Sequence, residues 1–365
     1  MKVFHCNKCQ QPIYFQNSVC VSCGSTLAYL PDIADMTALE PVGDGHWRPV
    51  SGPAASAVYT LCKNYSEQAV CNWAIGPSES VPYCHACRLT AVIPNLAIPG
   101  NLEAWRALEL AKRRLIYTLD KLGFLVTNRE DDPEDGVAYE FLSDTGPTPE
   151  ERAFTGHDNG VITINVAEAD DVERERRRKT LHEPYRTLLG HFRHEVGHYY
   201  WNLLMRDPTR LAGFRKLFGN EHLDYGEALE AHYKNGADPE WQSSYVSAYA
   251  SSHPWEDWAE TWAHYLHMSD ALETAADSGL RIPARPTPGS RNQAATDFDA
   301  MIEDWLTLAS VLNNLSRSLG QSDAYPFVLA PAVIEKLRFV HSCVPKPLNV
   351  RARIAVNAQP ELPDR

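Results

Sequence analysis

The sequence HEVGH at residues 194–198 places side chains that can bind and activate a metal ion at helical spacing. His194 and His198 would lie on one face of a helix, about 6 Å apart along its axis, so both imidazoles can reach one ion. Glu195 between them can hydrogen-bond a water on that ion without being a ligand itself. The flanking residues are apolar and predict a largely buried helix, which favours a metal centre over an accidental match on a surface helix: Leu188, Leu189, Phe192, Val196, Tyr199 and Trp201.

A hydrolytic zinc site needs a third protein ligand and one open position. The extended motif HExxHxxGxxH is excluded, because Trp201 and Leu204 stand at its last two defined positions. The segment 253–268, HPWEDWAETWAHYLHM, instead offers Glu256 and Glu260 on one face of an aromatic helix, where acids need a cation or hydrogen bonds. We expect Glu256 to be the ligand and Glu260 to orient a ligating histidine, with the reverse order as the alternative. Other candidates nearby are Asp224, Glu227, Glu230, His253, His264 and His267.

Eight of the nine cysteines fall in the first quarter of the chain, and six of these form CxxC pairs. In a chain without an export signal, this spacing indicates metal binding rather than disulfides. We expect two structural Zn²⁺ ions, with free buried thiols as the alternative at the less regular second set. His5 or His85 could replace a neighbouring cysteine ligand, and Cys343 has no expected role. The first set is Cys6, Cys9, Cys20 and Cys23, and the second is Cys62, Cys71, Cys84 and Cys87.

The charge around the cysteines bears on possible partners. Residues 1–95 contain five Lys or Arg against six Asp or Glu, which offers no phosphate-binding patch. The net charge of the whole chain is −13, which also disfavours a nucleic-acid partner. We therefore expect the cysteine-rich region to be structural or to dock a protein partner.

Several segments of the chain resemble a known family. HEVGH with a later glutamate helix resembles the gluzincin metallopeptidases, and YASSHPWEDWAE is similar to the ligand helix of the anthrax lethal factor-like clan. The chain to about residue 340 resembles, more closely, bacterial zinc-binding metallopeptidases that carry an N-terminal zinc-ribbon domain. The matching phrases are LCKNY, VCNWAI, YCHACRLTAVIPNL, EPYRTLLGHFRHEVGHYYW and HPWEDWAETWAHYLH. The resemblance implies a fold and a zinc site but names no substrate.

The lethal factor-like clan also implies roles for individual residues. In that clan the first glutamate of an ExxxE pair binds zinc and a tyrosine seven residues earlier assists at the transition state, which implies these roles for Glu256 and Tyr249. The alternative is that Tyr245 and Tyr249 form one aromatic face of a helix. Pro254 favours a loop over Ser251–Pro254 that folds the phenol back over the metal, because the residue before a proline avoids the helical region.

These side chains must be positioned by a mixed set of elements. Gly and Pro are frequent in residues 1–95, which predicts ribbon and loop. A helix is predicted from an N-cap at Asn101 to a stop at Gly123, and helices again dominate the residues from 170 to about 340. Short strands are predicted between these helical regions, at 124–127, 137–142 and 161–166.

Strands inserted among helices predict an α+β fold class. We expect a zinc-ribbon region at 1–95, a mostly helical metallopeptidase domain with a short sheet at 100–345, and a loose tail at 346–365. The run 160–170 is either an edge strand that can pair with an extended peptide or an internal strand of the sheet. The charge run 173–179 is expected to be a solvated helical face.

The preferred hypothesis for function is a zinc-dependent peptidase with one catalytic and two structural Zn²⁺ ions. His194, His198 and Glu256 would bind the catalytic ion, Glu195 would be the general base for a metal-activated water, and Tyr249 would stabilise the oxyanion. The alternative is a zinc-stabilised protein-binding module with a latent or degenerate peptidase fold, which the intact Glu195 argues against. We expect a peptide or protein substrate.

Further expectations concern location and two positions near the motif. No apolar run approaches the roughly 18 residues of a membrane span, and the N-terminus lacks the apolar stretch of a secretory signal. We therefore expect a cytoplasmic protein without a membrane partner. His191 is expected to be a hydrogen-bonded helix residue, with a carboxylate or substrate contact as the alternative, and Tyr185 and Arg186 are expected to fix the start of the HEVGH helix.

Overall fold

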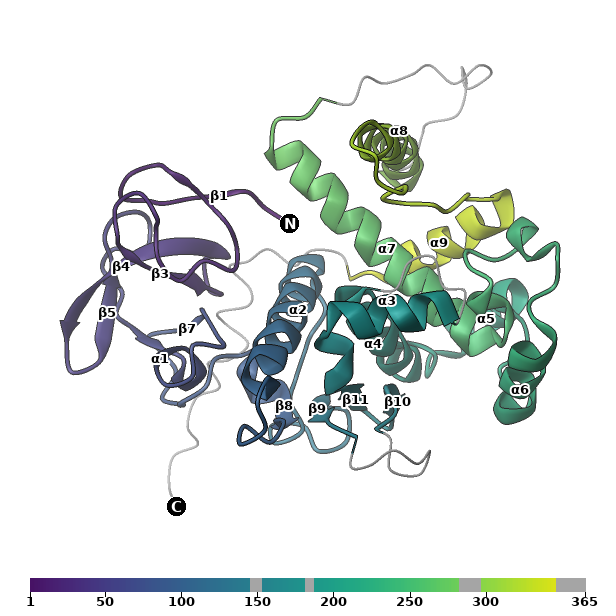
Figure 1. The fold of residues 1–365 in the computed structure, drawn as a ribbon, viewed down its shortest axis with the longest axis horizontal. Coiled ribbons are helices and arrows are strands. Elements are labelled where there is room, and N and C mark those ends of the chain that lie inside the picture. The colour runs from purple at the N-terminus through teal and green to yellow at the C-terminus, as the bar shows by residue number, and fades with distance from the viewer. Residues whose placement is uncertain (145–152, 181–186, 282–296, 346–365) are drawn as a thin grey trace.

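Strands and loops dominate the N-terminal region, which also contains one short helix (Figure 1). The computed structural model describes residues 1–144, 153–180, 187–281 and 297–345. In the N-terminal region β1 pairs with β2, and β3 to β7 form an antiparallel sheet in chain order. The elements are β1 (Phe4–His5), β2 (Pro12–Ile13), β3 (Thr26–Leu30), β4 (Asp35–Gly43), β5 (His46–Pro49), β6 (Tyr59–Leu61), α1 (Lys63–Ser66), β7 (Ala74–Ile75) and the 3-10 turn η1 (Cys87–Leu89).

Aromatic side chains join this region to the first long helix, α2 (Asn101–Leu122). The rings of Phe15 and Tyr29 lie 5.7 Å and 6.0 Å from the ring of Tyr117 on α2. Trp73 packs against Tyr29 at 4.6 Å and is fully buried. Because such rings bury large apolar areas, the N-terminal region and α2 share one hydrophobic core.

The helix α2 follows the predicted bounds except at its N-cap. The cap is Gly100, whereas Asn101 is the first helical residue and its side chain donates to the Asn95 carbonyl at 2.9 Å. Asn101 therefore braces the preceding turn instead of capping the helix. The helix ends at Gly123, which adopts a left-handed φ of 87° and closes the last turn with its own N–H.

A four-stranded sheet follows, in the order β10-β11-β9-β8. Its strands are β8 (Thr90–Val92), β9 (Ala138–Leu142), β10 (Gly156–Asp158) and β11 (Val161–Asn165). The strand β11 is internal, between parallel β9 and antiparallel β10, so the edge-strand interpretation of 160–170 is wrong and the edge strands are β10 and β8. Its internal position agrees with the burial of Ile162 and Ile164.

The predicted strand at 124–127 is a second correction. Phe124 and Val126 are buried while Leu125 is 80% exposed, which gives the alternation of a strand. Within the described residues, however, the nearest pairing is a single bridge between Asn128 and Val137. The segment is therefore a loop whose alternate side chains reach the core.

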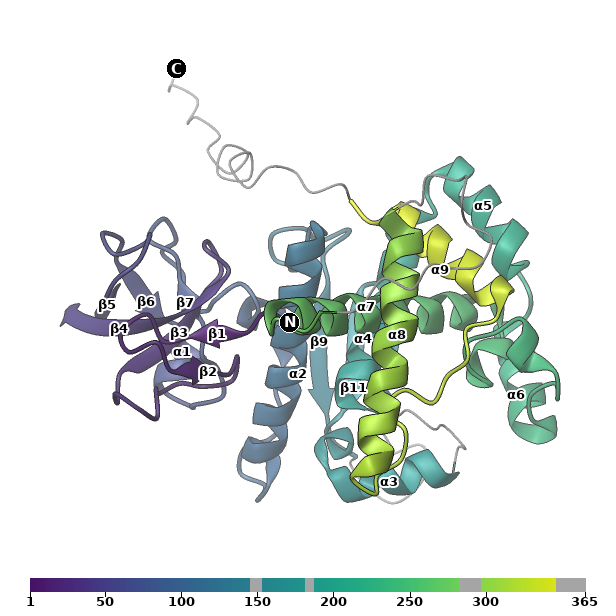
Figure 2. The ribbon, with the colours of Figure 1, turned by 90° about the horizontal axis from the view of Figure 1, so that it is seen from above.

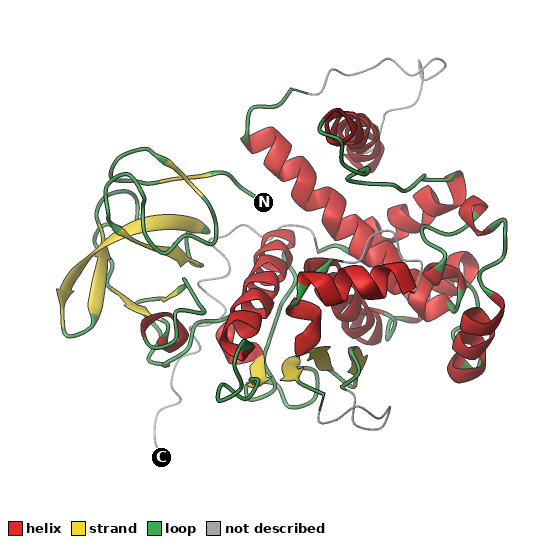
Figure 3. Cartoon of the chain, in the orientation of Figure 1, coloured by secondary structure: helices red, strands yellow, loops and turns green. Residues whose placement is uncertain are grey.

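Helices dominate the rest of the described residues (Figures 2 and 3). The helix α4 packs against both α7 and α2, and α9 packs against α7. Strands and helices together confirm the predicted α+β fold class. No helix in the described ranges is long and apolar enough to cross a membrane. The elements are η3 (Val166–Ala169), α3 (Asp171–Thr180), α4 (Leu188–Leu204), α5 (Pro208–Phe218), α6 (Tyr225–Asn235), η4 (Trp241–Ser243), η5 (Tyr249–Ser251), α7 (Pro254–Asp277), α8 (Asp297–Ser318) and α9 (Pro331–Cys343).

Some sequence predictions fall on or near the gaps between the described ranges. The charge run 173–179 lies in α3, where Arg176 is exposed but Glu173, Arg174 and Glu175 are half-buried, so the described side chains support the solvated-face prediction only in part. Tyr185, Arg186 and the tail at 346–365 lie outside the described residues.

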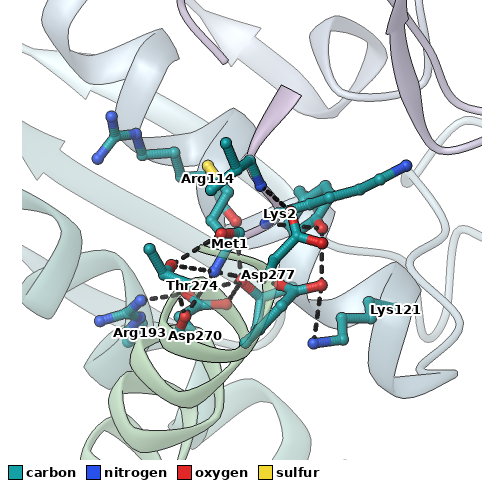
Figure 4. Close-up of polar contacts among 12 residues, drawn as sticks. Met1, Lys2, Arg114, Lys121, Arg193, Asp270, Thr274 and Asp277 are labelled. Carbon is teal, nitrogen blue, oxygen red and sulfur yellow. Dashed lines mark hydrogen bonds and ion pairs between the residues drawn. The ribbon is translucent and has the colours of Figure 1, made fainter. Parts of the chain in front are cut away.

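The first residues of the chain lie against the far end of α7 (Figure 4). The Met1 amino group donates to the Asp270 carbonyl at 2.5 Å and to Thr274 Oγ1 at 2.8 Å. The side chain of Asp270 in turn binds Arg193 on α4 and accepts from Thr118 of α2 at 2.7 Å. A single carboxylate on α7 thus connects α4 and α2 close to the point where the N-terminal region attaches.

Candidate active site

The helix α4 carries HEVGH and begins at a defined cap. Thr187 Oγ1 accepts a hydrogen bond from the Gly190 N–H at 3.0 Å. Gly197, inside the motif, faces α7 so closely that a Cβ there would lie 3.1 Å from the Ala259 Cα. Trp258 Nε1 donates to the Gly197 carbonyl at 2.9 Å. The glycine therefore lets the two helices approach closely enough for their polar side chains to meet.

Polar contacts fix where α7 begins and which of its faces points toward α4. His253 is the N-cap and accepts a backbone N–H at 3.1 Å, and Pro254 takes the first helical position. Asp257 is buried against Lys336 of α9, with 2.6 Å between carboxylate and ammonium. Burial raises the pKa of Asp257 to about 7, although Lys336 opposes the rise. Asp257 thus faces α9, and the neighbouring Glu256 faces α4.

Three side chains from α4 and α7 converge on one point. The Nε2 atoms of His194 and His198 lie 3.2 Å apart, and Glu256 Oε2 lies 2.9 Å from His194 Nε2. Glu256 Oε1 lies 3.5 Å from His198 Nε2, and the donor atoms are all within 4.8 Å of one another. Glu256 Oε2 is buried but has no hydrogen bond of good geometry within the described residues. Two imidazoles and a carboxylate with an unsatisfied oxygen form a donor set that fits Zn²⁺.

The electrostatics of the three donors favour a positive charge between them. Burial opposes the charged imidazole of His194, but hydrogen bonds and attraction from Glu256 and Glu260 outweigh burial and raise its pKa well above the ordinary value. Burial also opposes ionised Glu256, but His198 and His194 hold its pKa well below the usual range. A divalent cation among these atoms would supply the same positive charge.

Glu260 lies behind His194, on the opposite side of the ring from the three-donor cluster. Its Oε1 lies 2.8 Å from His194 Nδ1, and its Oε2 accepts from Ser247 Oγ at 2.7 Å. Burial would raise the pKa of Glu260, but His194 outweighs burial and lowers it to about 2. Because an ionised carboxylate only accepts hydrogen bonds, Nδ1 of His194 carries the proton and Nε2 is left to face the cluster.

Glu195 and Tyr249 lie beside the donors. Glu195 is 8% exposed and is not one of the three donors in the cluster. The Tyr249 ring lies 5.9 Å from the His194 ring. Burial raises the pKa of Tyr249 well above its ordinary value, and the charges of Glu256 and Glu195 add to the rise. Tyr249 is therefore a protonated phenol, able to donate a hydrogen bond, beside the ring of His194.

The local structure around Tyr249 decides between the two sequence alternatives. Tyr249 begins η5, whereas Tyr245 precedes that turn and stacks its ring 4.2 Å from Lys336 Nζ. The two tyrosines do not share a helix, so the aromatic-face alternative is wrong. The break before α7 is also shorter than predicted, because Ser251 ends η5 and Pro254 begins α7.

Sequence reasoning missed Tyr225, the first residue of α6. Its hydroxyl donates to Glu256 Oε1 at 2.7 Å, so it holds the oxygen nearer to His198. Burial raises the pKa of Tyr225, and the charge of Glu256 adds to the rise. The preceding Asp224, a candidate ligand in the sequence, caps α6 instead by accepting from the Glu227 N–H at 2.8 Å. No spacing signal marks Tyr225, because its role depends on where the fold places α6.

The other candidate ligands have partners or positions elsewhere. His264 lies 2.6 Å from the Tyr325 hydroxyl, and His267 lies 3.4 Å from Arg193. Glu227 and Glu230 are exposed on α6. His191 lies 3.5 Å from Glu168, so it contacts a carboxylate.

The edge strand β10 lies next to the histidines of α4. Its His157 ring lies 6.4 Å from the His198 ring and 6.2 Å from Trp255. His157 Nε2 accepts from the Gly160 N–H at 3.0 Å, which fixes the ring against the turn to β11. The strand that borders the three-donor cluster is therefore β10, not the predicted 160–170.

The first cysteine set closes into one cluster. The four sulfur atoms lie within 4.8 Å of one another, with 3.7 Å between Cys6 and Cys23 and 3.6 Å between Cys9 and Cys20. A zinc tetrahedron with bonds of about 2.3 Å places its sulfur ligands about 3.8 Å apart. The sulfur positions therefore fit Zn²⁺. His5 is exposed and is not one of the donors.

The second cysteine set forms a fully buried cluster beneath α2. It comprises Cys62, Cys71, Cys84 and Cys87, with 3.7 Å between the sulfur atoms of Cys71 and Cys84. Arg113 of α2 donates to the Val70 carbonyl at 2.7 Å. Burial would lower the pKa of Arg113, but Cys71 and Glu109 outweigh burial and raise it. Four thiolates around Zn²⁺ would carry excess negative charge, and the buried guanidinium of Arg113 lies where it can balance that charge. His85 is not one of the donors, and its Nε2 lies 3.7 Å from Asp120.

Comparisons with known proteins gave matches to both regions of the chain. A family model described as "Putative zinc-binding metallo-peptidase" matches residues 101–343, and a zinc-ribbon domain model matches residues 3–98. Proteins of Mycobacterium bovis and Mycobacterium tuberculosis, each named an uncharacterized protein, are 43% identical over 345 residues, which is 94% of this chain and 95% of theirs. No solved structure matches the chain.

The first family model covers most of the chain, including α4 and α7, and the second covers both cysteine sets. The donor clusters lie inside the matched residues. The chain therefore belongs to the zinc-binding metallo-peptidase family and carries an N-terminal zinc-ribbon domain.

Proposed function

We propose that the protein is a zinc-dependent peptidase in which His194, His198 and Glu256 hold the catalytic ion. The observation that carries this proposal is the convergence of two Nε2 atoms and one carboxylate within 4.8 Å, with Glu195 beside them but outside the donor set. A helix with HEVGH and a glutamate on a later helix is the gluzincin arrangement. Zn²⁺ held by these three donors would keep one position open to a water molecule.

The residues around the donors have complementary tasks. When bound, Zn²⁺ lowers the pKa of a water toward about 7 and polarises the scissile carbonyl. Glu195 accepts the proton of the attacking water and passes it to the leaving amine. Tyr249 donates its hydroxyl proton in a hydrogen bond to the oxyanion. Glu260 keeps His194 in the tautomer whose Nε2 would face the ion. Tyr225 donates to Oε1 of Glu256 and so holds this carboxylate in place.

The edge strand β10 is the candidate platform for the peptide. It has β11 on one side, and its other side is not paired in the described sheet. It packs against α4, which carries HEVGH. An extended peptide could add to this edge through backbone hydrogen bonds and reach the metal centre.

The two cysteine sets are proposed to bind structural Zn²⁺, for a total of three ions per chain. Their role is to hold the N-terminal fold and, where a protein partner exists, to present a docking surface. The near-neutral charge of residues 1–95 supports a protein partner over a nucleic acid.

Glu195→Gln tests the proposal, because it removes the base and leaves all three proposed ligands. Cellular proteins would be incubated with wild type or with the variant, and new N-termini would be labelled and identified. We expect new N-termini only with wild type, a turnover about 100–10,000-fold lower for the variant on any substrate found, and unchanged zinc content by elemental analysis. Equal cleavage by the variant would remove Glu195 from the mechanism.

A binding module with a latent peptidase fold is the second candidate. It predicts no new N-termini with wild type, and capture of the same partner by wild type and by Glu195→Gln. The intact Glu195 supports the peptidase, because a module that only binds has no need for the base.

A further inference from the structure

A cavity of about 740 Å³ lies beside the candidate active site. One wall is a face of α6, and the opposite wall is the chain that runs through η4 and η5 toward α7. Ser251 and Ser252, immediately before the cap of α7, line it as well. The cavity therefore adjoins the segment that leads directly from Tyr249 to Glu256.

One face of α6 connects the metal centre to this cavity. Tyr225, Ala228, His232 and Asn235 follow one another at spacings of three or four, so they lie along one side of the helix. Tyr225 donates to Glu256, and His232, about 10 Å further along the axis, lines the cavity. The ring of His232 lies 6.0 Å from the ring of Tyr249, which itself contacts His194. An extended peptide rises about 3.3 Å per residue, so a side chain two or three residues from the reacting bond would reach the cavity.

The segment around the cavity is strongly acidic. Residues 220–244 contain six Asp or Glu and one Lys, a net charge of −5 out of −13 for the whole chain. Asp238 and Glu240 are exposed and line the cavity itself. Asp238 Oδ1 accepts from the Glu240 N–H at 2.7 Å, which leaves its second oxygen and both oxygens of Glu240 for other donors. Burial lowers the pKa of His232, which disfavours the charged form of this ring.

The inner surface has room and hydrogen-bond acceptors for a long side chain. The α6 wall carries Ala228 and Ala231, whose small side chains leave the space open. Ser252 Oγ is buried and has no hydrogen-bond partner in the described part of the chain. A narrow apolar stem could therefore lie along the alanines while its polar end meets the carboxylates.

We propose that this cavity is the subsite for a basic side chain, lysine or arginine, of the peptide substrate. The inference rests on the proposed peptidase function and adds the class of substrate. The carboxylates of Asp238 and Glu240 accept from the cationic end, and the alanine face of α6 packs against the stem.

The test uses a set of quenched fluorescent peptides that carry Lys, Arg, Gln or norleucine in turn at the three positions on each side of the cleaved bond. Wild type, Glu240→Gln and Ala231→Phe are compared, with Glu230→Gln as the matched control, because Glu230 is on α6 but does not line the cavity. The same peptides are also bound to Glu195→Gln and followed by fluorescence anisotropy.

At one position wild type should prefer Lys or Arg over Gln by about fivefold, as one partly exposed ion pair allows. The preference should fall as salt rises, and should disappear in Glu240→Gln and in Ala231→Phe but not in Glu230→Gln. Equal cleavage of Lys and Gln peptides at every position overturns the subsite while the peptidase stands. If Glu230→Gln reduces the preference as much as Glu240→Gln does, the subsite is also overturned, because the preference would then come from the overall negative charge of the segment and not from the cavity. Basic peptides that bind selectively to Glu195→Gln but are never cleaved by wild type support the subsite and contradict the peptidase.

Discussion

The two regions of this protein support their candidate metal centres in opposite ways. In the zinc-ribbon domain, four donors of one type come from segments close in sequence, and backbone groups beside them help to hold the sulfur atoms, as the Trp73 N–H does at 3.3 Å from Cys71 Sγ. In the helical region that follows, the donors come from α4 and α7, and side chains from elsewhere hold them, such as Tyr225 on α6 and Ser247 behind Glu260.

The difference concerns chemistry as well as architecture. Four thiolates complete the shell of a tetrahedral ion, so the ion can only hold the fold, whereas three donors leave a position where a reaction can occur. The second cysteine set also differs from the first, since all four of its cysteines are buried beneath α2 while Cys9 of the first is exposed. An ion there would therefore hold the joint between the two regions.

Metal removal should separate the two kinds of centre and produce the largest effect. A mild chelator should remove one of three Zn²⁺ ions and abolish all hydrolysis, because a three-donor site exchanges its ligands more readily than a closed thiolate site. Elemental analysis and activity would be followed together, and zinc should restore activity. Loss of all three ions at the same chelator concentration would contradict the difference between the three-donor site and the four-cysteine sites.

Tyr249→Phe should give the next largest effect. Loss of an oxyanion donor costs about 2.7–4 kcal/mol, so turnover should fall roughly 100–1,000-fold with little change in substrate affinity or zinc content. Steady-state kinetics would be measured on a substrate for which chemistry limits the rate. Tyr245→Phe is the matched control, since that ring stacks on Lys336. Unchanged turnover in Tyr249→Phe would return this residue to a packing role.

Glu260→Ala should weaken zinc binding at the three-donor site by about 10–100-fold, as the loss of a partner of a ligating histidine does. Glu256→Ala should lose that ion altogether, and both variants should keep the ribbon ions. Competition with a fluorescent zinc chelator would measure the affinities. If Glu260→Ala lost the ion and Glu256→Ala kept it, the roles of the two acids would be exchanged.

Tyr225→Phe should give the smallest effect of the series. It removes the hydrogen bond to Oε1 of Glu256, which is worth about 1 kcal/mol, so zinc affinity should fall about threefold to tenfold. Tyr233→Phe on the same helix is the control and should leave the affinity unchanged. Equal affinities for wild type and Tyr225→Phe would mean that the donors of α4 and α7 need no support from α6.

The sequence could predict what depends on local spacing. HEVGH, the CxxC pairs and the helix of Glu256 and Glu260 are short patterns in which chemistry and spacing coincide, and the structure brings each set of donors together. The α+β fold class also followed from the mixture of periodicities.

Features that depend on tertiary placement could not be predicted in the same way. The segment 124–127 alternates like a strand because its buried side chains face the core, although it has no strand partner in the described residues. The position of β11 inside the sheet depends on β10, a strand too short to stand out. Tyr225 meets Glu256 only because α6 returns to the site, and no pattern within α6 indicates that contact.

The attachment of the first residues to α7 has a consequence for the order of events during synthesis. Met1 and Val3 bind residues that follow them by 269 to 274 positions. At about 5–20 residues per second, a ribosome needs about 13–55 s to make the intervening chain. The cysteines of the zinc-ribbon domain are therefore synthesised, and can acquire zinc, well before α7, the helix that Met1 and Val3 contact, has been made. Translation would therefore complete the proposed structural zinc sites before the three-donor site, whose Glu256 lies on α7.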